Sequence, residues 1–143
     1  MNKQNKLNVI ARSLIKKAQN ATEKAFPLSA KREDWEYLGY VGAAIETQSG
    51  NVFTGINLAL LCGIGFCAEH STAAMIQAGE TQLKRMVAVA HDGKVLPPCG
   101  RCRELIYQLN KKNLDAEVIL DEAERSVLLQ TLLPETWQKR IRV

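Results

Sequence analysis

The spacing of hydrophobic and polar positions changes along the 143-residue chain, and it predicts where helices and strands lie. Near the N-terminus, apolar residues recur every three or four positions, while most lysines fall on the opposite side of a helical wheel. This pattern predicts an amphipathic helix over roughly the first 20 residues. Its apolar positions are Leu7, Ile10, Ala11, Leu14, Ala18 and Ala21. Residues 26–38, which include a proline and mixed charges, are expected to form a loop.

Strand-like runs follow this loop. Residues 40–47 and 52–56 flank the sequence Gln-Ser-Gly-Asn at 48–51, and this combination predicts an antiparallel hairpin. Three later apolar runs are also predicted to be strands, namely 86–91, 117–121 and 126–131.

Two internal helices are predicted between these strands. Residues 67–79 are rich in Ala, Met and Ile and end at a glycine, a common helix stop. The prolines at 97–98 exclude a helix directly before Cys99, and apolar spacing from 100 to 112 restores a helical period. Residues 132–143 are expected to form a short helix or a tail. The order of elements, α-β-β-α-β-α-β-β, predicts a layered α/β protein with helices packed over a mixed sheet.

Composition narrows the class of protein. Apolar residues make up 46% and charged residues 24%, as in soluble globular chains, and the length suits one domain over residues 1–143. The net charge of +4 is small for a nucleic-acid binder, so no nucleic-acid partner is expected. The longest apolar run, 58–68, contains two glycines and is too short to span a membrane. Residues 1–7 lack the apolar stretch of a secretory signal, which predicts a cytoplasmic protein with reduced cysteines.

Reduced cysteines are candidates for metal binding or catalysis. Cys67 opens one predicted internal helix, and Cys99 and Cys102 open the next, on one face of that helix. Helix N-termini carry a partial positive charge that lowers the pKa of thiols, and thiolates bind Zn²⁺ well. Three protein ligands leave the fourth tetrahedral position for water, as in catalytic zinc sites. Glu69, two residues beyond Cys67, is placed to take a proton from such a water and pass it to a leaving amine.

The motifs around these residues resemble those of the zinc-dependent cytidine deaminase family. The resemblance rests on Cys-Ala-Glu at 67–69 and on Pro-Cys-Gly-Arg-Cys-Arg at 98–103. A cysteine instead of a histidine at the first metal position, here Cys67, resembles the pattern of the family's small enzymes that act on free nucleosides. Val-Gly-Ala-Ala-Ile at 41–45 and Leu-Leu-Pro at 132–134 extend the resemblance along the chain. It implies a three-layer α/β/α fold with a mixed five-stranded sheet.

The resemblance also implies a site and a reaction. One Zn²⁺ per chain would be held by Cys67, Cys99 and Cys102. Glu69 would be the catalytic acid and base in the hydrolytic deamination of a cytosine-type nucleoside. The backbone of Ala68 would hold the edge of the substrate ring.

A homotetramer is implied as well, with active sites at the subunit interfaces. In the family, an aromatic residue three places after the proline of the tail reaches across an interface to cover the substrate. In this chain that residue is Trp137, after Pro134. Trp137 is therefore expected to contact the substrate of a neighbouring subunit.

Several positions depart from the family pattern and concern the substrate. The family's Phe that stacks on the pyrimidine falls on Gly39, and its Asn and Glu that hold the ribose fall on Ile56 and Leu58. Asn57 is the nearest polar candidate for substrate binding, and ordinary cytidine is expected to bind weakly. Blasticidin S deaminase, a relative that acts on a cytosine nucleoside antibiotic with a modified sugar, also varies at the Asn. A cytosine nucleoside analogue of this kind is therefore an alternative substrate.

Two further residues are candidates to contact the metal ligands. The family has an Arg after Cys-Ala-Glu that neutralises the thiolates, and His70 replaces it here. Without that Arg, we expect Arg103 to hydrogen-bond the cysteine sulfurs.

Other interpretations stay open. A structural zinc site would need a fourth ligand, for which Cys62, His70 and His91 are candidates, and it would suit a non-catalytic zinc-stabilised binding module. Cys99 and Cys102 alone also match a redox motif. Within the enzyme class, the substrate could be another amino heterocycle.

Overall fold

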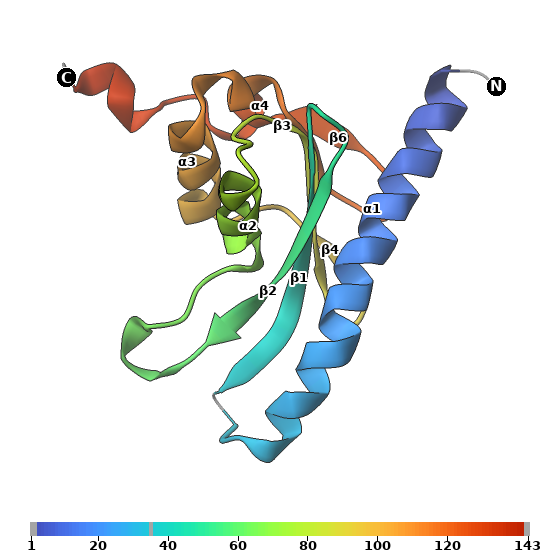
Figure 1. The fold of residues 1–143 in the computed structure, drawn as a ribbon, viewed down its shortest axis with the longest axis vertical. Coiled ribbons are helices and arrows are strands. Elements are labelled where there is room, and N and C mark those ends of the chain that lie inside the picture. Colours follow the sequence, from blue (N-terminus) through green and yellow to red (C-terminus); the bar gives the residue numbers. More distant parts are fainter. Residues whose placement is uncertain (1–2, 35, 142–143) are drawn as a thin grey trace.

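In a computed structural model, which describes residues 3–34 and 36–141, the chain forms a mixed β-sheet with helices on both faces (Figure 1). α1 lies along one face of the sheet, and α2 and α3 lie against the other. This arrangement confirms the predicted α/β class. The α-helices and strands are α1 (Lys3–Ala25), β1 (Tyr37–Thr47), β2 (Val52–Ala59), α2 (Thr72–Gln77), β3 (Leu83–Ala90), β4 (Val95–Leu96), α3 (Gly100–Leu109), β5 (Glu117–Ile119), β6 (Ser126–Leu128) and α4 (Leu129–Leu132). The 3-10 helices are η1 (Phe26–Lys31), η2 (Leu61–Gly63), η3 (Ala68–Ser71), η4 (Lys111–Asp115) and η5 (Trp137–Arg140).

The sheet has the strand order β2-β1-β3-β5-β6, and the additional strand β4 pairs with β3. β1 is antiparallel to β2 and β3, β3 is parallel to β5, and β5 is antiparallel to β6, so the sheet is mixed as predicted. The predicted hairpin is confirmed, since β1 and β2 pair around a turn in which the Thr47 N–H donates to the Asn51 carbonyl at 2.9 Å. β4 was not predicted, because a strand of two residues is too short to show alternation.

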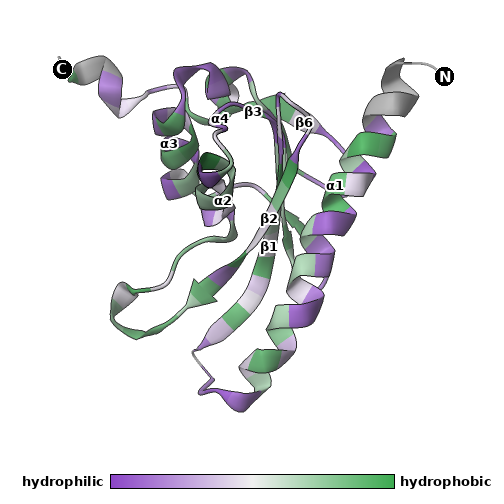
Figure 2. Ribbon diagram, in the orientation of Figure 1, coloured by the Kyte–Doolittle hydropathy of each residue, from purple (hydrophilic) through white to green (hydrophobic). Residues whose placement is uncertain are grey.

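Two separate cores flank the sheet, because successive residues of a strand point to opposite faces. Ala44 and Val87 belong to the core under α1. Their sequence neighbours Ile45 and Met86 belong to the other core, which also contains Met75 of α2. Figure 2 shows apolar residues along the central strands. Burial on both faces of the sheet is what a three-layer arrangement requires.

The predicted N-terminal helix is confirmed, and α1 extends it to Ala25. It turns Ala11, Leu14 and Ala18 into the core. Gly42 of β1 lets this helix lie directly on the sheet, since a Cβ there would come within 2.2 Å of the Ala18 carbonyl oxygen. No helix among the described residues combines the length and the apolar character needed to cross a membrane.

The two predicted internal helices are present with shifted bounds. The segment predicted as one helix over 67–79 begins as the 3-10 helix η3 and continues as α2. The helix predicted over 100–112 ends at Leu109, and the chain goes on as η4.

The strand predicted over 126–131 is correct only in its first half. β6 pairs with β5 over Ser126–Leu128, and the next residues form α4. The Leu129 N–H donates to the Ala116 carbonyl at 2.9 Å, and the side chain of Leu129 is fully buried in the core that contains Met75. Because the side chain of Leu129 packs in this core, the chain leaves the strand and forms α4 there, whereas the sequence pattern alone predicted that the strand continues.

Candidate functional site

Three cysteines lie at the starts of two neighbouring helices, as predicted. Cys67 (φ −75°, ψ 158°) and Cys99 (φ −66°, ψ 166°) are extended and directly precede η3 and α3. Cys102 lies in the first turn of α3. Pro98 helps to fix the start of α3, because proline disfavours helical continuation through the segment before Cys99.

A glycine in β2 brings η3 onto the sheet. A Cβ at Gly55 would lie 2.7 Å from the Ala68 carbonyl oxygen and 2.6 Å from the Cβ of Ser71. This close approach holds the helix start that carries Cys67 and Glu69 directly over β2.

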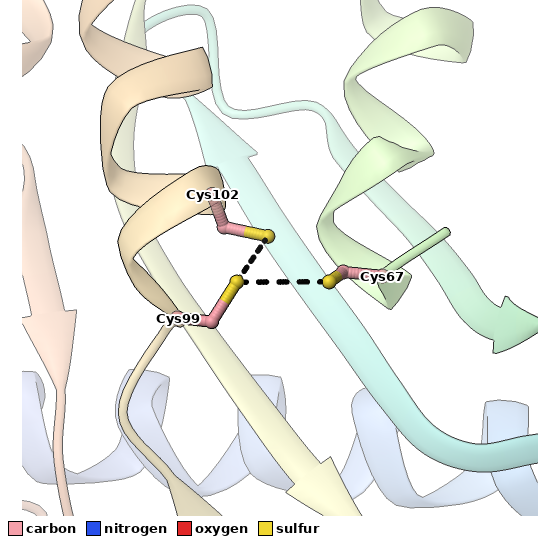
Figure 3. A group of neighbouring side chains, drawn as sticks. All are labelled: Cys67, Cys99 and Cys102. Atoms are coloured by element: carbon pink, nitrogen blue, oxygen red, sulfur yellow. Dashed lines mark hydrogen bonds between the residues drawn. The ribbon is translucent and has the colours of Figure 1, made fainter. Parts of the chain in front are cut away.

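The sulfur atoms of the three cysteines point toward one another from the two helix starts (Figure 3). The Sγ of Cys99 lies 3.6 Å from that of Cys67 and 3.5 Å from that of Cys102, and all three lie within 4.8 Å of one another. A tetrahedral zinc ion with Zn–S bonds of about 2.3 Å separates its sulfur ligands by about 3.8 Å. The donor chemistry and the spacing therefore fit zinc.

The described residues contribute no fourth His, Cys, Asp or Glu to this group. The ring of His91 stacks on Phe26 with centroids 3.9 Å apart, and the ring of His70 stacks on Phe66 with centroids 5.5 Å apart. Cys62 lies exposed in η2. The structural-zinc interpretation therefore lacks its fourth ligand in the described part of the chain.

Burial and hydrogen bonding move the thiol pKa values in different directions. Burial raises the pKa of Cys67, and burial together with the negative charge of Glu69 raises the pKa of Cys102 far above its usual range. Burial also acts to raise the pKa of Cys99, but hydrogen bonds from Cys102 and Cys67 outweigh it, and the net pKa is lowered. Of the three thiols at the helix starts, only Cys99 thus has a lowered pKa. A cation among the sulfurs would reverse the effect of burial, because a coordinating thiol loses its proton.

A cavity of about 340 Å³ opens beside the cysteines. Glu69 and Ala68 line it, and they are only 4% and 1% exposed. The wall is completed by a mainly apolar set that includes Val41, Asn57, Leu58, Phe66, Leu96 and Arg101. A buried carboxylate beside three thiols in a small, mainly apolar cavity is an arrangement suited to proton transfer on a bound ligand.

Asn57 is the polar residue of β2 in this wall. Its Oδ1 accepts a hydrogen bond from the Val41 N–H at 2.7 Å, where the pairing of β1 with β2 is irregular, and no hydrogen bond among the described residues uses its Nδ2. Leu58 also lines the cavity, whereas Ile56 does not. Of the two positions on which the family's ribose contacts fall, only Leu58 therefore lines the cavity, and Asn57, the predicted polar candidate, lies beside it in the same wall.

The aromatic residue at the cavity is not where the family pattern placed it. Gly39, with φ +71°, lies against the end of α1, and a Cβ there would come within 2.5 Å of the Ala25 Cβ. Phe66 lines the cavity instead. Sequence reasoning missed Phe66, and its place directly before Cys67 is the signal that could have found it.

The side chain of Arg103 hydrogen-bonds to two backbone carbonyls. Its Nε donates to the Pro98 oxygen at 2.8 Å, and its Nη1 donates to the Leu132 oxygen at 3.0 Å. These bonds replace the expected bonds to cysteine sulfur, because a carbonyl oxygen accepts more strongly than a thiol. Arg103 thus ties the segment before Cys99 to the C-terminal tail.

His70 does not take over the charge of the Arg that it replaces. Burial, and then the positive charge of Arg101, lower the pKa of His70, so its imidazole is neutral at pH 7. Its Nε2 is buried without a hydrogen-bond partner among the described residues. Arg101 is the cation that lines the cavity, and sequence reasoning gave it no role.

Trp137 lies in η5, apart from the residues that line the cavity. Its side chain is 67% exposed, so it does not pack into the core of its own chain. In Figure 1 the C-terminal segment leaves the body of the molecule.

The chain is similar to known proteins in sequence and in fold. No protein-family model matches the chain. The chain is similar to the cytidine deaminase of Mycobacterium tuberculosis, with 33% identity over 99 residues that cover 68% of this chain and 71% of that protein. It is also similar to the blasticidin-S deaminase of Bacillus cereus, with 32% identity over 77 residues, 47% of this chain and 55% of that protein. Among solved structures, the cytidine deaminase from Mycobacterium leprae superposes with a TM-score of 0.69 at 28% identity, over 87% of this chain and 97% of that one.

Proposed function

The chain belongs to the cytidine deaminase family, and on that basis we propose that it hydrolyses the exocyclic amino group of a cytosine-type nucleoside, releasing ammonia and the uracil form. The observation that carries the proposal is the buried carboxylate of Glu69 in a cavity lined by Cys67 and Cys99, whose sulfurs cluster with that of Cys102. Such a reaction needs a group that moves protons beside an activated water, and these residues supply the proton carrier and the metal ligands.

In this proposal, Cys67, Cys99 and Cys102 hold one zinc ion per chain. Their soft donor atoms and their mutual distances support the assignment. When bound, zinc supplies a water of lowered pKa for attack on the ring carbon that carries the amino group. The four cysteines of the chain are unpaired, which supports a location in the reducing cytoplasm.

Glu69 carries the proton. Its carboxylate takes a proton from the attacking water and passes it to the ring nitrogen. It then takes a second proton, from the hydroxyl gained by the ring carbon, and passes it to the amine as that group departs. Burial supports this role, because a carboxylate shielded from bulk water exchanges its proton with the bound reactants. The Ala68 backbone, one residue earlier in the same helix start, is placed to hold the edge of the ring.

Asn57 and Leu58 face the remainder of the substrate. Asn57 can donate from Nδ2 while its Oδ1 stays bonded to Val41, and Leu58 offers an apolar surface. An unpaired hydroxyl against an apolar wall costs about 1–3 kcal/mol. This wall and the similarity to a blasticidin-S deaminase support a second candidate substrate, a cytosine nucleoside analogue whose sugar is less polar than ribose.

The proposal also includes a homotetramer, in which neighbouring subunits complete the active sites. Trp137 supports it, because its exposed ring is available for a contact between subunits. Burying about 200 Å² of this ring contributes about 5 kcal/mol. Cys99 and Arg101 at the cavity are exposed, so a neighbouring chain could exclude water there.

Ammonia release from zinc-loaded protein tests the function against cytidine, deoxycytidine, cytosine, blasticidin S and a panel of amino purines. Release from a cytosine nucleoside is expected. No release from any cytosine compound, with zinc bound, would favour a zinc-stabilised binding module, and release from a purine alone would point to another amino heterocycle.

The role of Glu69 has its own variant. Glu69→Gln is expected to keep zinc and fold and to lose about 10²–10⁴-fold or more in turnover. Glu33→Gln, at an exposed site outside the cavity, is the matched control. Near-normal turnover of Glu69→Gln would remove Glu69 from the mechanism.

A further inference from the structure

Phe66 is the single aromatic residue among the described residues that line the cavity. Its side chain is 40% exposed. A ring beside the candidate catalytic residues offers a flat apolar face to whatever the cavity binds.

The backbone fixes where this ring starts. The Leu58 N–H donates to the Phe66 carbonyl at 2.9 Å, and the Phe66 N–H donates to the Leu58 carbonyl at 3.0 Å. Gly65 permits this return to β2, because a Cβ there would lie 2.2 Å from the Leu58 carbonyl oxygen. Residues 60–66, the β2–η3 loop, are thereby anchored on the sheet at the end that adjoins Cys67.

His70 fixes the orientation of the ring. The two rings are parallel within 8°, with centroids 5.5 Å apart. The His70 N–H donates to the Cys67 carbonyl at 3.1 Å, which holds this residue on the first turn of η3. The buried Nε2 of His70 has no partner among the described residues, and an aliphatic side chain would fill the space without that cost. What the imidazole adds is a flat, rigid surface behind Phe66.

We propose that the face of Phe66 turned away from His70 is the platform on which the planar heterocycle of the substrate stacks, and that His70 is a positioning residue for that platform. The inference rests on the proposed function, since it places a planar ring in this cavity. Stacking tolerates many planar rings. Phe66 therefore supplies affinity and orientation, while hydrogen bonds elsewhere in the cavity select the ring.

Replacement of Phe66 tests the platform. In zinc-loaded protein, Phe66→Leu removes the aromatic face at similar size, and Phe66→Tyr retains it. We expect Phe66→Leu to raise KM for the best nucleoside, and the Kd of uridine measured by calorimetry, by about 5- to 150-fold. Phe66→Tyr should stay within about threefold of the parent protein. Ile64→Ala is the control, because Ile64 lies in the same loop, is 70% exposed and does not line the cavity.

A double-mutant cycle tests the positioning role. His70→Leu should raise KM and the uridine Kd in the parent protein and have no further effect in the Phe66→Leu background, because its influence passes through Phe66. Equal effects of His70→Leu in both backgrounds would overturn the positioning role.

The result that overturns the platform is distinct from a failure of the proposed function. Phe66→Leu with parental KM and parental uridine affinity, in a protein that deaminates a nucleoside, would remove the platform and leave the function intact. A parent protein that deaminates no cytosine nucleoside would remove the function itself.

Discussion

Asn113 joins three parts of the chain, and its replacement by leucine should destabilise the fold strongly. The side chain is fully buried. Its Oδ1 accepts from the Leu83 N–H at 2.8 Å, and its Nδ2 donates to the carbonyls of Thr81 at 3.0 Å and Ile106 at 2.9 Å. The Ile106 carbonyl lies in the last turn of α3, where helix carbonyls lack partners within the helix. One amide therefore secures both the start of β3 and the end of α3.

The loss of stability follows from the backbone groups that leucine leaves without a hydrogen-bond partner. Leucine has a similar size but neither donor nor acceptor, so the Leu83 N–H and the Ile106 carbonyl stay buried without this partner. Each costs about 2 kcal/mol, within the range for unsatisfied buried groups. The Thr81 carbonyl is only partly buried and can bond water. Burying an apolar side chain in place of the amide offsets about 1 kcal/mol, which leaves a loss of about 3 kcal/mol.

Urea denaturation followed by circular dichroism measures this loss, with protein and zinc concentrations held fixed because both affect apparent stability. Asn110→Leu is the matched control. The side chain of Asn110 accepts from the Lys112 N–H at 3.0 Å and donates to the Thr81 Oγ1 at 3.2 Å, both in exposed positions. This control should cost about 1 kcal/mol or less. If Asn113→Leu costs no more than Asn110→Leu, the reasoning from buried partners is refuted.

Four further predictions concern the site and the assembly. Cys102→Ser should lower the zinc content well below one ion per chain by elemental analysis, and full occupancy would contradict the ligand assignment. In zinc-free protein, the lowered pKa of Cys99 leaves more of its thiol as thiolate at a given pH, so iodoacetamide should label Cys99 before the buried Cys102. Labelling of Cys99 should slow as the pH falls through its lowered pKa. Peptide mass spectrometry measures the order of labelling, and the reverse order would contradict the pKa directions. Gly55→Ala should cost about 1–3 kcal/mol in denaturation, because its Cβ meets the Ala68 carbonyl, and an unchanged midpoint would show that η3 can move away. If the proposed tetramer forms, Trp137→Ala should shift it toward smaller species in light scattering, whereas a monomeric parent protein would end the assembly proposal.

Features with a strong local pattern could be predicted from the sequence. The helical spacing of Ala11, Leu14 and Ala18 defined the buried face of α1, and the turn at 48–51 defined the β1–β2 hairpin. Leu129 shows where local pattern ends. It continues an apolar run, and only the packing of its side chain in the core makes it the start of a helix instead of part of a strand.

In the candidate site too, short motifs could be predicted from the sequence, whereas contacts between distant segments could not. The clustering of Cys67, Cys99 and Cys102 could be predicted, because two short motifs, at 67–69 and 98–103, place these residues at helix starts. Phe66 could not be placed, because its position depends on how the β2–η3 loop returns to the sheet. Asn57 was a candidate from the sequence, but its hydrogen bond to Val41 at an irregular strand pairing could not be predicted. The bonds of Arg103 depend on a tail 29 residues away in sequence, which no local motif encodes.

The residues proposed to carry the chemistry and the residue proposed to face the substrate ring come from different kinds of segment. The cysteines and Glu69 belong to the first turns of helices held on the sheet, whereas Phe66 ends a surface loop attached by a pair of hydrogen bonds to Leu58. Variation in the length or composition of that loop reshapes one wall of the cavity and leaves the helix starts in place. The fold is therefore open to a change of the cavity wall through a short, graftable segment, in evolution or by design, while the cluster of three cysteines stays as it is.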